Sequence, residues 1–376
     1  MQKLYIYLMI TIFTLTGCQK SFISENKLNV AENKSNSKNI SMQYIENNSD
    51  FYKNGVIFGR EKAMFLDFDT MEKAPLCTIP NCTHKNSNCL ANMVGENPVI
   101  YNENIYYFNS IAGVNVTSDG KQEFYINSKL MKATLNSSEI ETVVSFTECM
   151  PNTPSYYVLK ENELFFTGND MCPTEDEYGV INYSTVGGTH FLCSINLDTG
   201  KYTNYGSIYD EDKKYKMADS SSGANITGIY DNKMYIQYVF MKENPKDLGI
   251  SPEENWTHVN FEFDFSTKKF TKSSLPYAVY MDNDTYVYLD NETDTTVVID
   301  NNEKYIVPHY DFTSSSAKVI KNKIFFSDSW YDLTDLSEHT YGEFDGYEVI
   351  AYYDNNYILL NDELTAKISE EELLAF

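Results

Sequence analysis

The sequence repeats one pattern of polar and apolar positions seven times. In each copy a short polar turn, usually containing Asn, leads directly into a run of aromatic and aliphatic residues, as in Lys53-Asn54-Gly55-Val56-Ile57-Phe58 and Glu161-Asn162-Glu163-Leu164-Phe165-Phe166. The apolar runs begin at residues 56, 105, 164, 234, 285, 324 and 357, which are 33 to 70 residues apart. A turn followed by β-forming residues predicts a strand after a hairpin in every copy.

A second element follows most of these copies. Here apolar and polar residues alternate and then end in a polar turn, as in Phe65–Thr70, Phe191–Lys201, Phe261–Lys268 and Trp330–Leu336. Alternation with a period of two gives a strand with one buried face, and Asp198-Thr199-Gly200-Lys201 is typical of a hairpin turn. Each unit is therefore predicted to be a small antiparallel meander.

The spacing of the copies brackets the roughly 40 to 50 residues of a four-stranded propeller blade. We predict an all-β fold: a single β-propeller over residues 51–376 with about seven blades, six or eight also being compatible with the spacing. Aromatic residues make up 15% of the chain, which favours strands. A pair of β-sandwiches is the alternative that turn spacing leaves open. The only helical signal is at the C-terminus, where Ser369 and Glu372 are spaced as a capping box.

The N-terminus is typical of a secreted lipoprotein. Residues 1–17 contain Lys3 and then an apolar stretch that is too short to span a membrane, so we interpret them as a signal peptide. Leu15-Thr16-Gly17-Cys18 resembles the lipobox of lipoprotein signal peptidase substrates. That resemblance implies that Cys18 becomes the first mature residue and carries a diacylglyceryl anchor. An ordinary signal peptide with an incidental cysteine is the alternative.

Residues 18–50 are predicted to form a flexible tether between the lipid and the propeller. After Cys18 they are rich in Ser, Asn, Glu and Lys and show neither a helical nor a strand period. About 30 flexible residues have a root-mean-square reach of roughly 30 Å. We therefore expect the folded part to stand off the outer face of the cell membrane.

The chain is strongly acidic, with 54 Asp and Glu against 29 Lys and Arg and a net charge of −25. Such a surface repels polyanions, so we expect no nucleic-acid partner. The charge fits either attraction of cationic partners or simple solubility outside the cell. We expect a monomer that contacts the membrane through the lipid on Cys18.

A compact cluster of soft ligands follows the first repeat. Cys77, Cys82, His84 and Cys89 lie within thirteen residues, and Ile79-Pro80-Asn81 and Asn86-Ser87-Asn88 supply turns between them. Three thiolates and one imidazole complete a tetrahedral zinc shell, which predicts one structural zinc ion.

Disulfides are the alternative to zinc at this cluster, because the mature chain has six cysteines besides Cys18 and is predicted to lie outside the cytoplasm. Free thiols or a redox role also remain open. Among Cys149, Cys172 and Cys193 we expect either one further disulfide or buried free thiols.

A cysteine cluster of this spacing, placed after a first propeller-like unit and behind a lipobox, is similar to that of uncharacterised β-propeller lipoproteins of Gram-positive gut bacteria. The resemblance implies the fold and the location. It implies no activity.

The sequence lacks the His-Glu-x-x-His, Gly-x-Ser-x-Gly and P-loop motifs, and His190, His258, His309 and His339 are isolated in sequence. Our first hypothesis is a non-enzymatic binding or protein-interaction module for a peptide, glycan or protein ligand. The second is an extracytoplasmic enzyme, such as a glycan lyase or hydrolase, with its site at the propeller axis.

The anchor hypothesis is tested by Cys18→Ala. The variant should lose acylation and move from the detergent phase to the aqueous phase, because two acyl chains provide most of the membrane affinity. Mass spectrometry of the mature N-terminus and phase partitioning measure both effects. A variant that still partitions into detergent would refute the anchor.

Overall fold

The computed structural model describes most of the chain after residue 49. The described ranges are 50–58, 62–77, 79, 81–85, 89–93, 98–118, 120, 122–134, 139–146, 150–151, 157–169, 172–175, 181–184, 190–208, 223–241, 256–282, 284–310, 317–361 and 364–375. The predicted signal peptide, Cys18 and nearly all of the predicted tether lie outside these residues.

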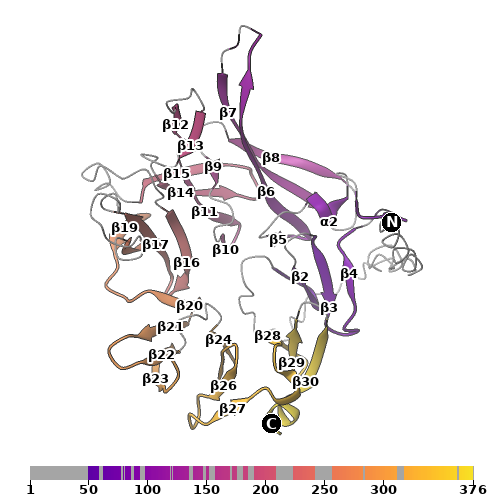
Figure 1. The fold of residues 1–376 in the computed structure, drawn as a ribbon, viewed down its shortest axis with the longest axis vertical. Helices are drawn as coiled ribbons and strands as arrows, with labels where there is room; N and C mark the ends of the chain where they lie inside the picture. The colour runs from indigo at the N-terminus through magenta and orange to yellow at the C-terminus, as the bar shows by residue number, and fades with distance from the viewer. Residues whose placement is uncertain are drawn as a thin grey trace, which may run out of the picture.

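Seven antiparallel sheets of described strands are arranged as the blades of one β-propeller (Figure 1), which confirms the predicted fold and blade count, and one further two-stranded sheet lies outside the blades. Blade 1 contains β1 (Asp50–Tyr52), β2 (Gly55–Phe58), β3 (Met64–Asp67) and β4 (Lys73–Pro75). Blade 2 contains β5 (Val99–Tyr101), β6 (Asn104–Val116), β7 (Gln122–Thr134) and β8 (Ile140–Phe146). Blade 3 contains β10 (Val158–Lys160), β11 (Glu163–Asn169), β14 (His190–Asn196) and β15 (Tyr202–Ser207), with β9 (Met150–Pro151) paired to β11.

The other four blades follow in chain order. Blade 4 contains β16 (Gly223–Tyr230), β17 (Lys233–Met241), β18 (Trp256–Asp264) and β19 (Lys269–Lys272), and blade 5 contains β20 (Ala278–Asp282), β21 (Thr285–Asp290), β22 (Thr295–Asp300) and β23 (Glu303–Val307). Blade 6 contains β24 (Lys318–Ile320), β25 (Lys323–Phe325), β26 (Ser329–Asp332) and β27 (Glu338–Thr340), and blade 7 contains β28 (Glu348–Tyr353), β29 (Asn356–Leu360) and β30 (Thr365–Ser369).

Helical segments in the described residues are short. They are α2 (Leu90–Met93), the 3₁₀ turn η2 (Gly342–Phe344) and α5 (Glu370–Leu374). The described residues contain no helix that is long and apolar enough to cross a membrane.

The seven repeats of the sequence are the seven hairpins between the first and second strands of the blades. Each hairpin has a two-residue turn, and in the six copies where the first turn residue is described, its φ lies between 47° and 60°. A left-handed residue at this position matches the twist of the hairpin, which explains the frequent Asn and Asp. We call the face of the disc with these turns the turn face.

The second strand of each blade is buried on both sides. In β11 the side chain of Phe165 packs into the seam with blade 4, and the next residue, Phe166, packs into the seam with blade 2. The apolar runs are therefore continuous rather than alternating, as expected for a strand with no solvent-facing side. Apolar clusters fill all seven junctions between neighbouring blades; their members include Ile57 and Tyr107, Phe108 and Phe166, Phe165 and Phe263, Tyr235 and Tyr286, Val298 and Phe326, Phe325 and Tyr357, and Val56 and Ile358.

The ring closes where blade 7 meets blade 1. Phe68, fully buried, packs in one cluster with Ile358 and lies 5.5 Å from the Tyr353 ring between centroids. The Tyr353 hydroxyl donates to Asp69 Oδ1 at 2.9 Å, and the Lys367 ammonium donates to the Phe68 carbonyl at 3.2 Å. Apolar packing and polar contacts across residues about 290 positions apart thus join the two ends of the domain.

Blade 7 has three strands, whereas the sequence pattern predicted four-stranded blades. The chain enters α5 where a fourth strand would begin, because Ser369 caps the helix: its side chain accepts from the Glu372 N–H, and Glu372 reciprocates at the Ser369 N–H. This confirms the predicted C-terminal helix and its capping box.

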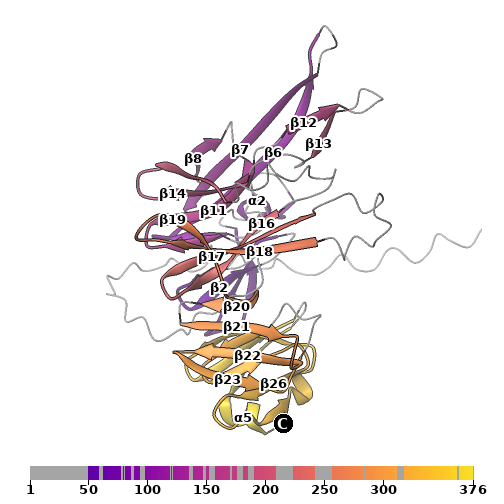
Figure 2. The ribbon, with the colours of Figure 1, turned by 90° about the vertical axis from the view of Figure 1, so that its left-hand side faces the viewer.

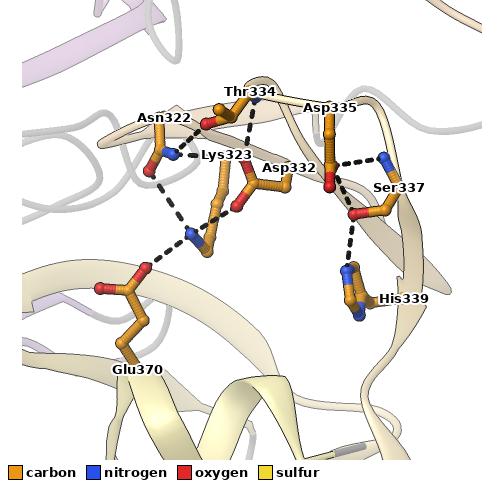
Figure 3. A network of polar contacts seen from close by, with 8 residues as sticks. All are labelled: Asn322, Lys323, Asp332, Thr334, Asp335, Ser337, His339 and Glu370. Carbon is orange, nitrogen blue, oxygen red and sulfur yellow. Dashed lines mark hydrogen bonds and ion pairs between the residues drawn. The ribbon is translucent and has the colours of Figure 1, made fainter.

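A buried lysine connects α5 to blade 6 (Figure 3). The side chain of Lys323 is 1% exposed, and its ammonium donates to Asp332 Oδ2 at 3.0 Å and to Glu370 Oε1 at 2.7 Å. Burial lowers the pKa of Lys323, but the two carboxylates outweigh burial and raise the pKa above its usual value. Lys323 therefore remains charged and holds the helix in place.

The insertions of the propeller lie on the face opposite the turn face, which we call the insertion face. The link between β6 and β7 extends there, the hairpin of β12 (Cys172–Glu175) and β13 (Ile181–Ser184) lies between β11 and β14, and the cysteine loop connects β4 to β5. Figure 2 shows the β6–β7 and β12–β13 hairpins projecting to the same side of the disc.

Replacing Lys323 with Ala should lower the free energy of unfolding by about 2–3 kcal/mol, slightly less than for a fully buried pair because Glu370 reaches water. The loss should be constant between about pH 5 and pH 10. Because the pKa of Lys323 is raised, its contribution to stability is fully present at pH values below 10.5. Because the pKa of Asp332 is lowered, the contribution of this carboxylate is fully present at pH values above 3.8. Denaturant unfolding at several pH values measures it, with exposed Lys304→Ala as the control. Equal stabilities of the two variants would contradict the role of the pair.

Candidate metal centre

The cysteine loop, residues 76–93, bridges blades 1 and 2, and both of its ends are fixed in the seam between them. Leu76 precedes the first ligand and Leu90 follows the last, and both side chains are buried in the apolar cluster of that seam. The backbone adds two bonds: the Leu76 N–H donates to the Ala63 carbonyl, and the Ala63 N–H donates to the Ala91 carbonyl, each at 2.8 Å. Cys77 and Cys89 are therefore positioned by the packing of their neighbours.

The first predicted turn folds the loop back between Cys77 and Cys82. The Cys82 N–H donates to the Ile79 carbonyl at 3.2 Å, and Asn81 adopts a φ of 56°. Pro80 and Asn81 are the residues that such a turn prefers. This local geometry is encoded entirely in the sequence Ile79-Pro80-Asn81-Cys82.

The four predicted ligands converge. Their ligand atoms, three Sγ and one imidazole nitrogen, all lie within 4.8 Å of one another, and His84 Nδ1 is 3.4 Å from Cys89 Sγ. Around a tetrahedral zinc ion with Zn–S bonds of about 2.3 Å, sulfurs lie roughly 3.8 Å apart. The arrangement fits a metal ion with four protein ligands after small movements.

Backbone N–H groups support two of the sulfurs. The Ile79 N–H donates to Cys77 Sγ at 3.4 Å, and the His84 N–H donates to Cys82 Sγ at 3.3 Å. Donors aimed at sulfur stabilise the thiolate, which is the form that binds metal. His84 adopts a φ of 53°, and its carbonyl accepts from the Asn92 side chain at 2.9 Å, which fixes the backbone at this ligand.

The ligands differ in their protonation. Burial, with smaller contributions from the neighbouring thiols, raises the pKa of Cys77 to about 12, whereas the His84 N–H lowers the pKa of the more exposed Cys82. Burial and then the charge of Lys62 lower the pKa of His84, so the imidazole is neutral at pH 7. Cys82 and His84 are the two accessible ligands, and Cys77 and Cys89 form the buried floor.

The other cysteines and histidines are dispersed over the fold. Cys193 is buried in blade 3 with its sulfur 3.0 Å from the Tyr202 hydroxyl, while Cys149 and the Cys172 side chain lie outside the described residues. The four isolated histidines occupy separate environments: His190 is buried beside Tyr238, His258 is exposed, His309 packs on Phe326 and His339 stacks on Trp330.

Sequence reasoning missed the charged residues at the inner strands of blades 6 and 7. Lys318 in β24 is 4% exposed and is paired with Glu348 in β28. Its position three residues before the predicted turn at Lys321-Asn322 carries no pattern that separates it from an exposed lysine. The large β6–β7 hairpin was also missed, although its uncharged run from Asn104 to Val116 is visible in the sequence.

No protein-family model matches the chain, and no curated protein sequence is detectably similar to it. Among solved structures, an oligogalacturonate lyase in complex with manganese aligns over 85% of this chain and 75% of its own, with 10% identity and a TM-score of 0.31. TolB from Acinetobacter baumannii aligns over 77% of each chain, with 10% identity and a TM-score of 0.28. An acylaminoacyl peptidase from Pyrococcus horikoshii aligns over 88% of this chain and 53% of its own, with 11% identity and a TM-score of 0.38. These scores are too low to carry an argument about function.

Proposed function

We propose that this chain is a lipid-anchored, extracytoplasmic binding protein that recognises a peptide, glycan or protein ligand through its insertion face. The observation that carries the proposal is the difference between the two faces of the disc. The turn face has the two-residue hairpins between the first and second strands and short turns between the third and fourth strands, whereas the insertion face has the β6–β7 hairpin, the β12–β13 hairpin and the cysteine loop. Loops placed on a rigid scaffold are where binding proteins keep their recognition surfaces.

The proposed anchor at Cys18 agrees with the direction of β1. The C-terminal end of β1 enters the two-residue turn at Lys53-Asn54, so its first residue, Asp50, lies toward the insertion face. The tether would leave the disc on that side. The proposed recognition surface would then face the membrane in which the lipid is inserted.

The hydrolase form of the enzyme alternative requires a general acid and a base on either side of one substrate bond. A glycosidase uses two carboxyl groups roughly 5–9.5 Å apart, and the described charged pair near the inner strands, Lys318 with Glu348, is instead a closed ion pair. Binding is therefore the function that the described geometry supports better.

A structural zinc ion in the cysteine loop is the second part of the proposal. Cys77, Cys82, His84 and Cys89 would complete the tetrahedral shell and leave no open position for substrate, as in structural rather than catalytic zinc sites. The ion would hold the loop closed over the seam between blades 1 and 2. Its contribution would be to stability, because the site forms only when the loop folds.

The binding hypothesis is tested on the full mature chain in detergent micelles. A glycan array and a displayed library of random peptides should each be screened for retention, and the same glycans should be incubated with the protein and analysed for cleavage products. Retention without cleavage supports a binding module. Cleavage, or no retention of either ligand class, would overturn it.

The zinc hypothesis predicts about one zinc ion per chain after purification without added metal. Cys82→Ser and His84→Ala should each lower the zinc content, and chelation should lower the unfolding temperature, because removing a ligand of the folded state destabilises it. Elemental analysis and thermal unfolding measure these effects. Cys193→Ala is the control for loss of a thiol and should keep its zinc. Disulfides among Cys77, Cys82 and Cys89 in metal-free protein would refute the site.

A further inference from the structure

The β6–β7 hairpin extends well beyond the body of blade 2. The edge of β6 that faces away from β7 pairs with β5 only as far as Tyr106. The edge of β7 that faces away from β6 pairs with β8 only as far as Ser128. From Ile111 to Val116 the two strands are paired with each other and with no other described strand. We call residues 111–116 and 122–127 the ribbon; it is the long projection at the top of Figure 2.

The ribbon therefore presents the backbone of two strand edges. Natural proteins usually protect such edges with lysine, proline or a bulge, because an open edge pairs readily with another extended chain. The thirteen residues of β6 contain no charged residue and no proline, although 22% of the whole chain is charged. The register between Ile111 and Val116 also runs without a bulge.

The side chains of the ribbon combine exposure with close cross-strand packing. Ile111 is 49% exposed and Val116 is 69% exposed, so both can contact a ligand. Opposite Tyr125, Gly113 has no side chain, and a Cβ at that position would lie 2.6 Å from the tyrosine hydroxyl. The absence of a side chain at Gly113 thus leaves room for the Tyr125 ring to lie across the neighbouring strand.

We propose that the ribbon binds an extended segment of another polypeptide by β-strand addition. This inference rests on the proposed binding function and names its ligand class. The segment would be uncharged where it pairs with Ile111–Val116 and would carry Lys or Arg beside that stretch, because the rest of this protein is acidic. A strand supplies backbone donors and acceptors at the spacing of the open edge, and its side chains would pack on the exposed aliphatic residues.

Two other occupants fit the ribbon less well. A lipid bilayer does not accept unpaired strand edges, because their N–H and C=O groups would lose water without gaining partners. A second copy of this chain would bring two bodies of net charge −25 together, and the repulsion opposes their pairing. A neutral segment with basic flanks would pair with the N–H and C=O groups of the strand edge and would also be attracted by the negative charge of this protein.

The test uses peptides of about twelve residues, a length that covers the six-residue edge with its flanks, selected from a random displayed library on the full mature chain in micelles. Fluorescence anisotropy of the labelled peptides should give an affinity that falls about tenfold or more in the Ile111→Lys/Val116→Lys variant, since lysine blocks edge pairing. Both positions are exposed, so the fold should persist in circular dichroism. The matched control is Ile306→Lys, which changes a 52% exposed aliphatic residue on β23 and should leave the affinity unchanged.

A second measurement isolates the backbone. N-methylation of alternate peptide residues keeps every side chain but removes N–H donors, and it should weaken binding by about tenfold or more if the peptide adds as a strand.

The inference would be overturned if no peptide were selected, if all variants bound the peptides equally, or if N-methylation left the affinity unchanged. It would also be overturned if sedimentation showed a dimer that the double lysine variant loses, because the ribbon would then bind a second copy. Binding to phosphatidylglycerol vesicles that the same variant loses would identify a membrane as the occupant instead. Glycan retention without any peptide would overturn the ribbon inference alone and leave the binding function standing.

Discussion

The packing of blade 7 against blade 1 is the interaction on which the ring depends. Each apolar cluster between blades joins only two neighbours, so an unclosed arc would leave one apolar face exposed at each end. Phe68 is one of several fully buried residues in this seam, and loss of its ring would cost about 3–5 kcal/mol. Among the described strands, none from one end of the chain joins the sheet at the other end. Closure instead relies on side chains, with Tyr353 and Lys367 bonding back to the turn after β3.

The sequence predicted the blade count because the fold imposes a local pattern on the second strand of each blade. Adjacent residues such as Phe165 and Phe166 are buried in opposite seams, so the run must be apolar throughout, and the two-residue turn before it favours Asn or Asp. The features that escaped prediction depend on distant partners. Lys323 resembles any exposed turn lysine in sequence, and only the approach of Glu370 from α5 makes its burial possible.

The candidate metal site was predictable because all four ligands lie on one short loop with turn residues between them. What the sequence did not indicate is how the loop is attached. Leu76 and Leu90 place its two ends in the seam between blades 1 and 2, so an ion that closes the loop would also oppose separation of these blades. Loop and seam are thus connected, and an ion bound at this local site would act on the stability of the first junction of the ring.

The proposals on anchor and ligand meet at the insertion face. From Ile111 to Val116 the ribbon covers five residue steps, or about 17 Å, which is within the roughly 30 Å reach of the predicted tether. Because β1 enters the disc from the same side, the ribbon, which also runs outward past the rim of the disc (Figure 1), would lie on the membrane side of the propeller. An extended segment of a neighbouring polypeptide could reach the ribbon there, and it is the class of ligand that the open, uncharged β6 edge favours, because only an extended chain matches the spacing of its free N–H and C=O groups.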